Sequence, residues 1–92
     1  MTDGKPGQRL RIIKEARGFR HNTDMARALE IGNTALANWL DGESIPPDKG
    51  YKIAALIPGL KPEWLWTGDR ASSTWDAIQA LEQAEARLSA KR

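Results

Sequence analysis

Residues 28–42 read ALEIGNTALANWLDG. Apolar residues recur here at intervals of three and four, which predicts one helix on each side of a short turn near Gly32. On a helical wheel, residues 33–41 divide into an apolar face and a polar face. The apolar face holds Ala35, Leu36, Trp39 and Leu40, and the polar face holds Asn33, Thr34, Ala37, Asn38 and Asp41. The stretch therefore predicts two helices joined by a turn, of which the second presents short polar side chains.

That polar face contains residue types that a face used only for solvation would seldom need. Asn and Thr favour helix less than Glu, Lys or Gln do. Asn can form two hydrogen bonds with the edge of adenine, and Thr can bond a base or contact the thymine methyl group. The small side chain of Ala37 lets the backbone approach a groove. We expect Asn33, Thr34 and Asn38 to read bases, with ordinary surface residues as the alternative interpretation.

The same spacing continues along the chain without the alternation typical of strands, so we expect an all-α fold. A first helix is predicted over residues 8–17, with Gly18 ending it. Its outer face is expected to carry Arg9, Arg11, Lys14 and Arg17. The second helix is predicted to begin at Asn22 or Thr23, because either side chain can accept hydrogen bonds from the free amides of a helix start.

Two further helices are predicted after the third. Pro46 and Pro47 separate the third helix from a fourth, in which Tyr51 is expected to belong to the core. A short fifth helix carries Trp64 and Trp66, which supply large apolar surface. These tryptophans are expected to complete the small core.

A last helix is predicted from residue 74 to about residue 90. Ser73 with Asp76 three residues later resembles a capping box. The apolar spacing covers barely two heptads, which is too short for a coiled coil. The helix is expected either to dock onto the body, the favoured alternative for so small a domain, or to pack against a second chain. In the second case the candidate dimer-interface residues of this helix are Trp75, Ile78 and Leu81.

The composition excludes several classes of protein. The chain has 92 residues and no cysteine, which predicts one small domain without disulfides, thiolate metal ligands or a cysteine nucleophile. No apolar run approaches the roughly 20 residues that span a bilayer, and no signal peptide is recognisable. We therefore expect a soluble cytoplasmic protein. His21 stands alone, so we expect neither a metal nor a cofactor. Motifs such as GxSxG or HExxH are absent, so we do not expect an enzyme.

Charge is distributed unevenly along the chain, whose formal net charge is +2. Residues 1–27 contain seven Lys or Arg against three Asp or Glu, a net of +4, whereas residues 28–92 contain seven against nine, a net of −2. This asymmetry fits an anionic partner at one end of the domain, and a solvated helix face would produce it equally well.

Three segments together resemble the lambda-repressor-like helix-turn-helix regulators, which include phage repressors, Cro proteins and Xre-type regulators. The segments are RLRIIKEARGF, DMARALEIGNTALANWLDGESIPP and KIAALIPGLKPEWLWTG. The resemblance covers residues 8–68. It leaves residues 1–7 as a flexible arm, residues 69–73 as a linker and residues 74–92 as a C-terminal helix with a candidate role in dimerisation.

The resemblance implies a homodimer that lays residues 33–40 of each chain into the major groove of double-stranded DNA. By position, Asn33, Thr34 and Asn38 would read bases, while Asn22 would contact the DNA backbone and brace the recognition helix. Further candidates for backbone contacts are Arg9, Arg11, Arg17, Arg20, Lys49 and Lys52. Because the fifth helix often lies at a dimer contact in this family, the resemblance also makes Trp64 and Trp66 candidate dimer-interface residues, as the alternative to a place in the core.

The sequence departs from the family pattern in ways that bear on DNA affinity. Glu30 replaces the usual turn glycine, at a cost of about 1 kcal/mol if its φ is positive. Lys14 and Leu40 replace the Arg and Glu that many members pair. Glu43 and Asp48 lie in a loop that is often basic in the family, so we expect modest phosphate affinity with a shallow salt dependence.

The resulting expectation is a sequence-specific DNA-binding transcriptional regulator, of the phage or prophage repressor type, that binds a palindromic operator as a dimer. The alternative is an antitoxin or accessory helix-turn-helix module whose main partner is a protein.

Overall fold

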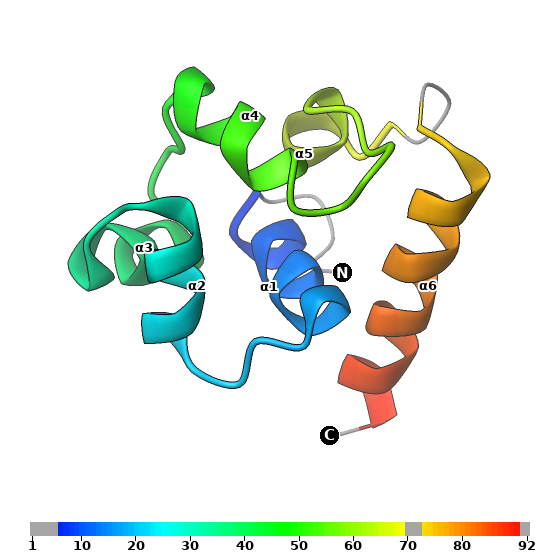
Figure 1. The fold of residues 1–92 in the computed structure, drawn as a ribbon, viewed down its shortest axis with the longest axis horizontal. Coiled ribbons are helices and arrows are strands. Elements are labelled where there is room, and N and C mark those ends of the chain that lie inside the picture. The colour runs from blue at the N-terminus through cyan, green and yellow to red at the C-terminus, as the bar shows by residue number, and fades with distance from the viewer. Residues whose placement is uncertain (1–5, 70–72, 91–92) are drawn as a thin grey trace.

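Six α-helices and no strand are found over residues 6–69 and 73–90, which the computed structural model describes (Figure 1). The helices are α1 (Pro6–Arg17), α2 (Asn22–Leu29), α3 (Asn33–Leu40), α4 (Pro47–Ala54), α5 (Glu63–Thr67) and α6 (Trp75–Ala90). The predicted all-α class is confirmed. No helix within these two ranges has both the length and the apolar character needed to cross a membrane.

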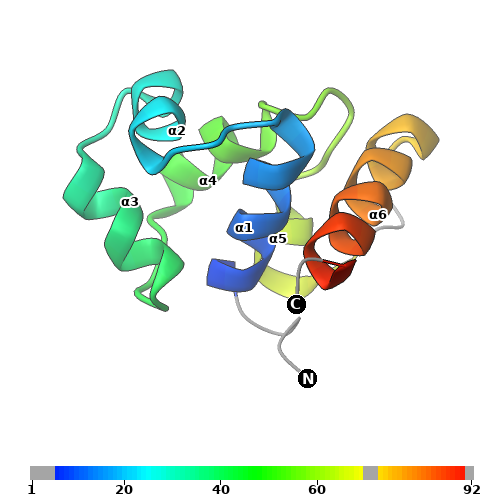
Figure 2. The same cartoon turned by 90° about the horizontal axis from the view of Figure 1, so that it is seen from below.

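Helix α1 lies at the centre of the molecule and contacts α3, α5 and α6. Figures 1 and 2 show α2 and α3 on one side of it and α6 on the other. Leu10 and Ile13 of α1, three positions apart, are completely buried, as the spacing predicts. The largest other buried side chains are Met25, Leu36, Ile53, Trp64, Leu65 and Leu81. All six helices therefore share one core arranged around α1.

The start of α1 approaches the end of α3 backbone to backbone. A Cβ atom added to Gly7 would lie 2.8 Å from the carbonyl oxygen of Trp39 and 3.0 Å from that of Leu40. Gly7 is buried within α1, so the prediction that it belongs to a flexible arm is wrong. Pro6, also in the predicted arm, is the first residue of α1, and residues 1–5 lie outside the described residues. The glycine permits an approach that any side chain would obstruct.

The turn between α2 and α3 depends on Glu30 in a left-handed conformation, with φ 60° and ψ 44°. The N–H of Glu30 donates to the carbonyl of Arg27, and the N–H of Ile31 donates to that of Ala26. These bonds satisfy carbonyls at the end of α2. The Glu30 carboxylate lies 3.7 Å from Nζ of Lys52, but both side chains are well exposed, so this ion pair adds little stability.

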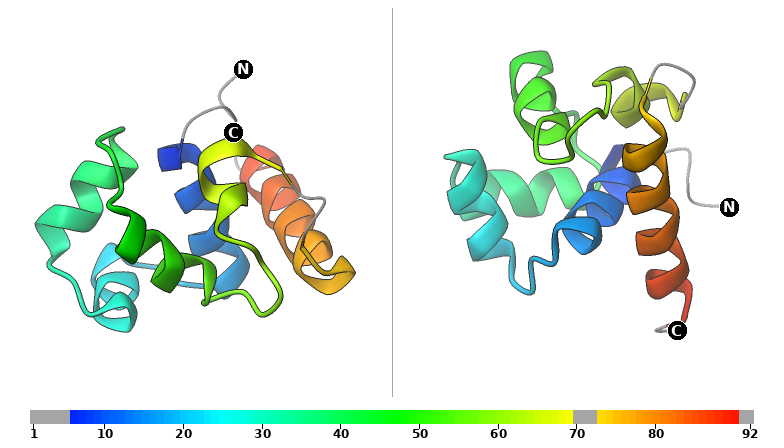
Figure 3. Two further views of the ribbon diagram at one scale, coloured as in Figure 1. Left: turned by 90° about the horizontal axis from the view of Figure 1, so that it is seen from above. Right: turned by 45° about the vertical axis from the view of Figure 1, so that its right-hand side comes forward.

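Helix α6 docks onto α1, the favoured of the two sequence-based alternatives (Figure 3). Leu81 and Ala84 of α6 are completely buried. Arg87 donates from Nε to Oε2 of Glu15 at 3.0 Å and from Nη2 to the Glu15 carbonyl at 3.2 Å. An apolar seam and an ion pair at its edge therefore hold the last helix against the body.

The predicted capping box at the start of α6 is wrong. Oγ1 of Thr74 accepts the N–H of Ala77 at 3.2 Å, so Thr74 caps the helix. Oγ of Ser73 accepts the N–H of Lys61 instead, at 3.1 Å. The cap lies one residue later than predicted because Ser73 connects to the segment before α5. Of the predicted linker 69–73, residues 70–72 lie outside the described residues.

The predicted core position of Tyr51 is also wrong, because this side chain is 63% exposed. The buried stripe of α4 runs through Gly50, Ile53 and Ala54, at spacings that exclude Tyr51. The indole ring of Trp66 packs against Gly50 so closely that an added Cβ would collide with it. Trp66 therefore packs against Gly50, and the side chain of the neighbouring Tyr51 stays in solvent.

Replacing Gly7 with alanine should lower the free energy of unfolding by about 1–3 kcal/mol, because α1 would have to move away from α3. The measurement is urea denaturation followed by circular dichroism. Gly32→Ser is the control, since no atom lies within 4 Å of a Cβ at Gly32 and its φ is −76°. A Gly7→Ala protein as stable as the control would contradict the close approach.

Glu30→Gly should raise the free energy of unfolding by about 1 kcal/mol, because glycine adopts the left-handed conformation without strain. Glu30→Ala removes the same ion pair and keeps a Cβ, so it should change stability by less than about 0.5 kcal/mol. Thermal and urea melts of both variants distinguish the two contributions. A stability gain shared equally by both would show that the backbone conformation is not its source.

Candidate functional site

Helix α3 presents the polar face that the sequence predicts. Its opposite face is anchored in the core through Leu36, Trp39 and Leu40, all less than 9% exposed. Asn33 and Thr34 are exposed in its first turn, whereas Ala37 and Asn38 are half-buried. The helical-wheel division is therefore confirmed. The structure brings Asn33, Thr34 and Asn38 together along one helix of eight residues.

The charges around α3 are not those of a strongly basic surface. Gly32 occupies the N-cap position and the first turn of α3 contains no acidic residue. Asp41 and Glu43 are exposed just beyond the C-terminal end. An anion would therefore meet polar groups and free backbone amides at the start of α3 and carboxylates at its end. The modest phosphate affinity expected from the sequence stays a prediction.

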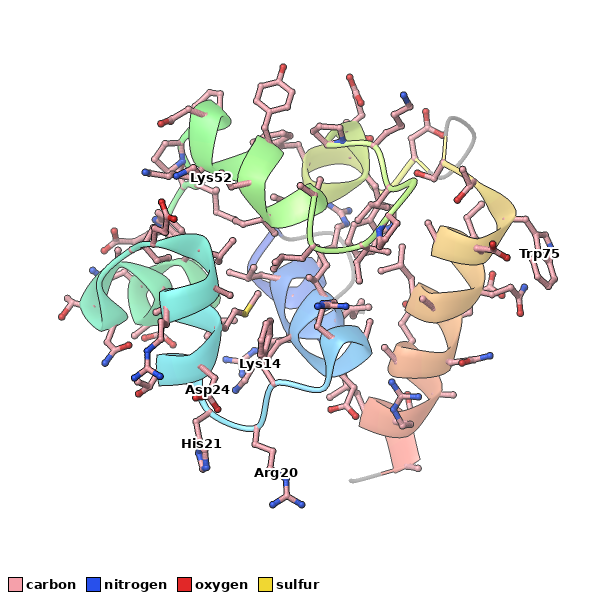
Figure 4. All side chains as sticks on the ribbon, in the orientation of Figure 1. Lys14, Arg20, His21, Asp24, Lys52 and Trp75 are labelled. Carbon is pink, nitrogen blue, oxygen red and sulfur yellow. The ribbon has the colours of Figure 1, made fainter. Side chains whose placement is uncertain are left out.

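Asn22 is held by α1 and does not cap α2. Nζ of Lys14 donates to Oδ1 of Asn22 at 2.7 Å in a partly buried contact. Figure 4 shows Lys14 directed from α1 towards the start of α2. His21 occupies the N-cap position of α2, and its side chain makes no capping hydrogen bond. The predicted capping roles of Asn22 and Thr23 are therefore wrong. Asn22 instead ties the start of α2 to α1.

Arg9 is not on the outer face of α1, so its predicted role as a phosphate contact is wrong. The residue is 6% exposed, and its Nη1 donates to the carbonyl of Leu65 at 3.1 Å. Helix α5 has only five residues, so its carbonyls cannot all be satisfied within the helix. Arg9 supplies a charged donor to one of them, the carbonyl of Leu65. The side of α1 that carries Arg9 faces α5, and no local sequence pattern indicates this.

Three other cations gather on one groove. Arg11, Lys14 and Arg20 line a groove of about 540 Å³ between the C-terminal half of α1, the loop that follows it and the end of α6. Glu15, Gly18, Phe19 and Leu88 complete its lining. The sequence indicated the basic character of α1 but gave no sign that α6 forms one wall. Arg17 is exposed outside this groove.

The remaining predicted residues are more scattered. Lys49 is half-buried at the start of α4, and Lys52 pairs with Glu30. Figure 4 shows Arg20 and His21 pointing away from the body of the protein. Across the described ranges, no three His, Asp or Glu side chains converge as a metal site would require. The candidate backbone contacts therefore belong to separate surfaces rather than one continuous patch.

The candidate dimer residues differ widely in exposure. Trp64 and Leu81 are at most 2% exposed and belong to the core of the chain itself, so their side chains have no surface to offer a second chain. Trp66 and Ile78 are half-buried. Trp75 is 71% exposed at the start of α6 and points away from the body in Figure 4. Trp75 is thus the most accessible of the five.

Comparisons of the chain with protein-family models, with curated proteins and with solved structures found no match. The resemblance of the sequence to helix-turn-helix regulators therefore stays a prediction. The polar face of α3 and the groove beside α1 are the two surfaces whose chemistry can be argued from the residues themselves.

Arg9→Met should lower the free energy of unfolding by about 1–3 kcal/mol, because the Leu65 carbonyl would lose its donor in a buried setting. Arg17→Met, at an exposed position of the same helix, should stay within about 0.5 kcal/mol of the original protein. Chemical denaturation of the two variants provides the comparison. Equal losses of unfolding free energy in the two variants would show that the buried hydrogen bond of Arg9 adds no stability.

Proposed function

We propose that this protein is a sequence-specific DNA-binding regulator of the lambda-repressor-like helix-turn-helix type. In this proposal α3 lies in the major groove, and Asn33, Thr34 and Asn38 contact the edges of bases. The observation that carries it is a helix with one face fixed in the core and the other face made of short amide and hydroxyl side chains. An α-helix of this width fits the major groove of B-DNA.

The anchoring of α3 supports a reading role. Base discrimination requires side chains held in place by rigid packing. Leu36 and Trp39 fix the helix from beneath, and the approach of Gly7 to the Trp39 carbonyl fixes its C-terminal end. Helices α2 and α3 contact each other and are joined by residues 30–32 alone. Two short contacting helices with so brief a turn fit a helix-turn-helix unit.

Contacts to phosphates would come from side chains outside α3. Asn22 uses its amide oxygen for Lys14, and no described residue accepts from its amide nitrogen, which can donate to a phosphate. Lys49, Lys52 and the exposed Arg17 supply positive charge. Because the exposed Asp41 and Glu43 lie just beyond the C-terminal end of α3, few counterions are released on binding. The proposal therefore includes moderate affinity and a shallow dependence on salt.

A homodimer completes the proposal, because two copies of α3 would read half-sites about one helical turn apart. Trp75 is the side chain best exposed to form part of the contact between the chains. No cofactor and no enzymatic step is part of this function.

A second candidate function is an antitoxin or accessory module whose main partner is a protein. The exposure of two large aromatic side chains, Tyr51 at 63% and Trp75 at 71%, favours it, since such residues are enriched at protein interfaces. In that case DNA binding through α3 would serve autoregulation.

The first experiment is fluorescence anisotropy of the protein with duplex DNA from upstream of its own coding sequence, against a scrambled duplex of equal length. The salt concentration should be about 150 mM, where non-specific binding is weak. We expect tight binding to the first duplex only. Equal, weak binding to both duplexes would contradict the proposed function and favour the protein-partner alternative.

Asn33→Ala and Asn38→Ala should each weaken binding by about 1–3 kcal/mol at one base pair per half-site, because each removes a base-edge hydrogen bond. Affinities for a set of single-base-pair variants of the duplex measure this. Gln83→Ala, exposed on α6, is the control and should bind every duplex as the original protein does. Losses that are uniform over all base substitutions would contradict base reading by these two residues.

A further inference from the structure

The groove beside α1 has two walls. One wall is α1 and the loop that follows it, which contribute Arg11, Lys14 and Phe19, and the other is α6, which contributes Leu88. We call this site, with Glu15, Gly18 and Arg20, the α1–α6 groove. Its volume of about 540 Å³ lies within the range typical of ligand-binding pockets.

The α1–α6 groove carries an excess of positive charge. Lys14 bonds a neutral amide, that of Asn22, so its charge is not neutralised by this contact. The one carboxylate of the lining, that of Glu15, is held by Arg87 at 3.0 Å. Arg11 and Arg20 also line the groove, and both are exposed. These two guanidinium groups therefore face solvent, and the neighbouring carboxylate of Glu15 is already paired with Arg87.

Apolar surface lies between these charges. Phe19 and Leu88 are partly buried and pack against the core, and they come from opposite walls of the groove. A ligand that combined carboxylates with an apolar side chain would satisfy both features, since the apolar group would lose contact with water while the carboxylates met arginines.

We propose that the α1–α6 groove binds an acidic peptide segment of a partner protein. In this arrangement carboxylates of the segment pair with Arg11 and Arg20, and an aliphatic or aromatic side chain lies against Phe19 and Leu88. The binding is separate from DNA reading by α3 and does not depend on it. It also assigns a role to α6, because the second wall of the site would not exist without that helix.

The same observations favour a peptide over the DNA backbone. A phosphodiester chain has no apolar side chain to cover Phe19 and Leu88. An acidic peptide segment can place an apolar residue there and keep its carboxylates near Arg11 and Arg20.

The test uses a short fluorescein-labelled peptide in which glutamates flank one leucine and one phenylalanine, and it measures anisotropy with the full-length protein. Two control peptides replace either the glutamates with glutamine or the two apolar residues with serine. We expect the first peptide to bind and both controls to bind at least about tenfold more weakly, because each control lacks half of the proposed recognition.

Arg11→Gln and Arg20→Gln should each weaken peptide binding by roughly three- to tenfold, since each removes one charge at the groove. Arg27→Gln is the matched control, because Arg27 is an exposed arginine of α2 outside the groove. Both groove substitutions are at exposed positions, and circular dichroism verifies that the variants are folded.

Two results would overturn the proposal. One is an equal loss of peptide affinity in Arg27→Gln and the groove variants, which would show general charge attraction. The other is weakened duplex binding with unchanged peptide binding in Arg11→Gln and Arg20→Gln, which would assign the groove to the DNA backbone. Failure of base reading is detected separately with Asn33→Ala and Asn38→Ala, so the two proposals can fail independently.

Discussion

The close packing of α1 against the end of α3 is the constraint on which the rest of the structure depends. Gly7 lets the backbone of α1 lie against the carbonyls of Trp39 and Leu40, so α3 is fixed by backbone contact as well as by its buried side chains. Rigid placement of α3 is what gives its outer face a defined position. A looser junction would leave the same polar residues on a helix without a fixed orientation.

The opposite side of α1 holds α6 and one wall of the α1–α6 groove. Buried residues of α6 and the contact of Arg87 with Glu15 fix the last helix there, and the groove beside them combines arginines with apolar side chains. One central helix thus positions two surfaces of different chemistry. The face of α3 offers short hydrogen-bonding groups suited to base edges, and the α1–α6 groove offers positive charge around an apolar strip.

Local periodicity predicted the helices and the two faces of α3, because side-chain spacing along one helix is a property of the sequence itself. The errors arose where a distant segment decides the outcome. Arg9 belongs to a basic stretch, but its partner is a carbonyl 56 positions away. The spacing in α4 predicts Tyr51 in the core, but the contact with Trp66 is made by its neighbour Gly50. Docking of α6 onto the body was predicted, but the sequence does not show that α6 contacts α1, so the groove between them could not be predicted.

The most direct test of the central claim is an NMR titration with the upstream duplex, observing the side-chain amide signals of Asn33 and Asn38. Base reading by α3 predicts that these signals shift, while the corresponding signal of Gln83 stays in place. Unchanged signals of both asparagines, with shifts confined to the guanidinium groups of Arg11 and Arg20, would contradict the account.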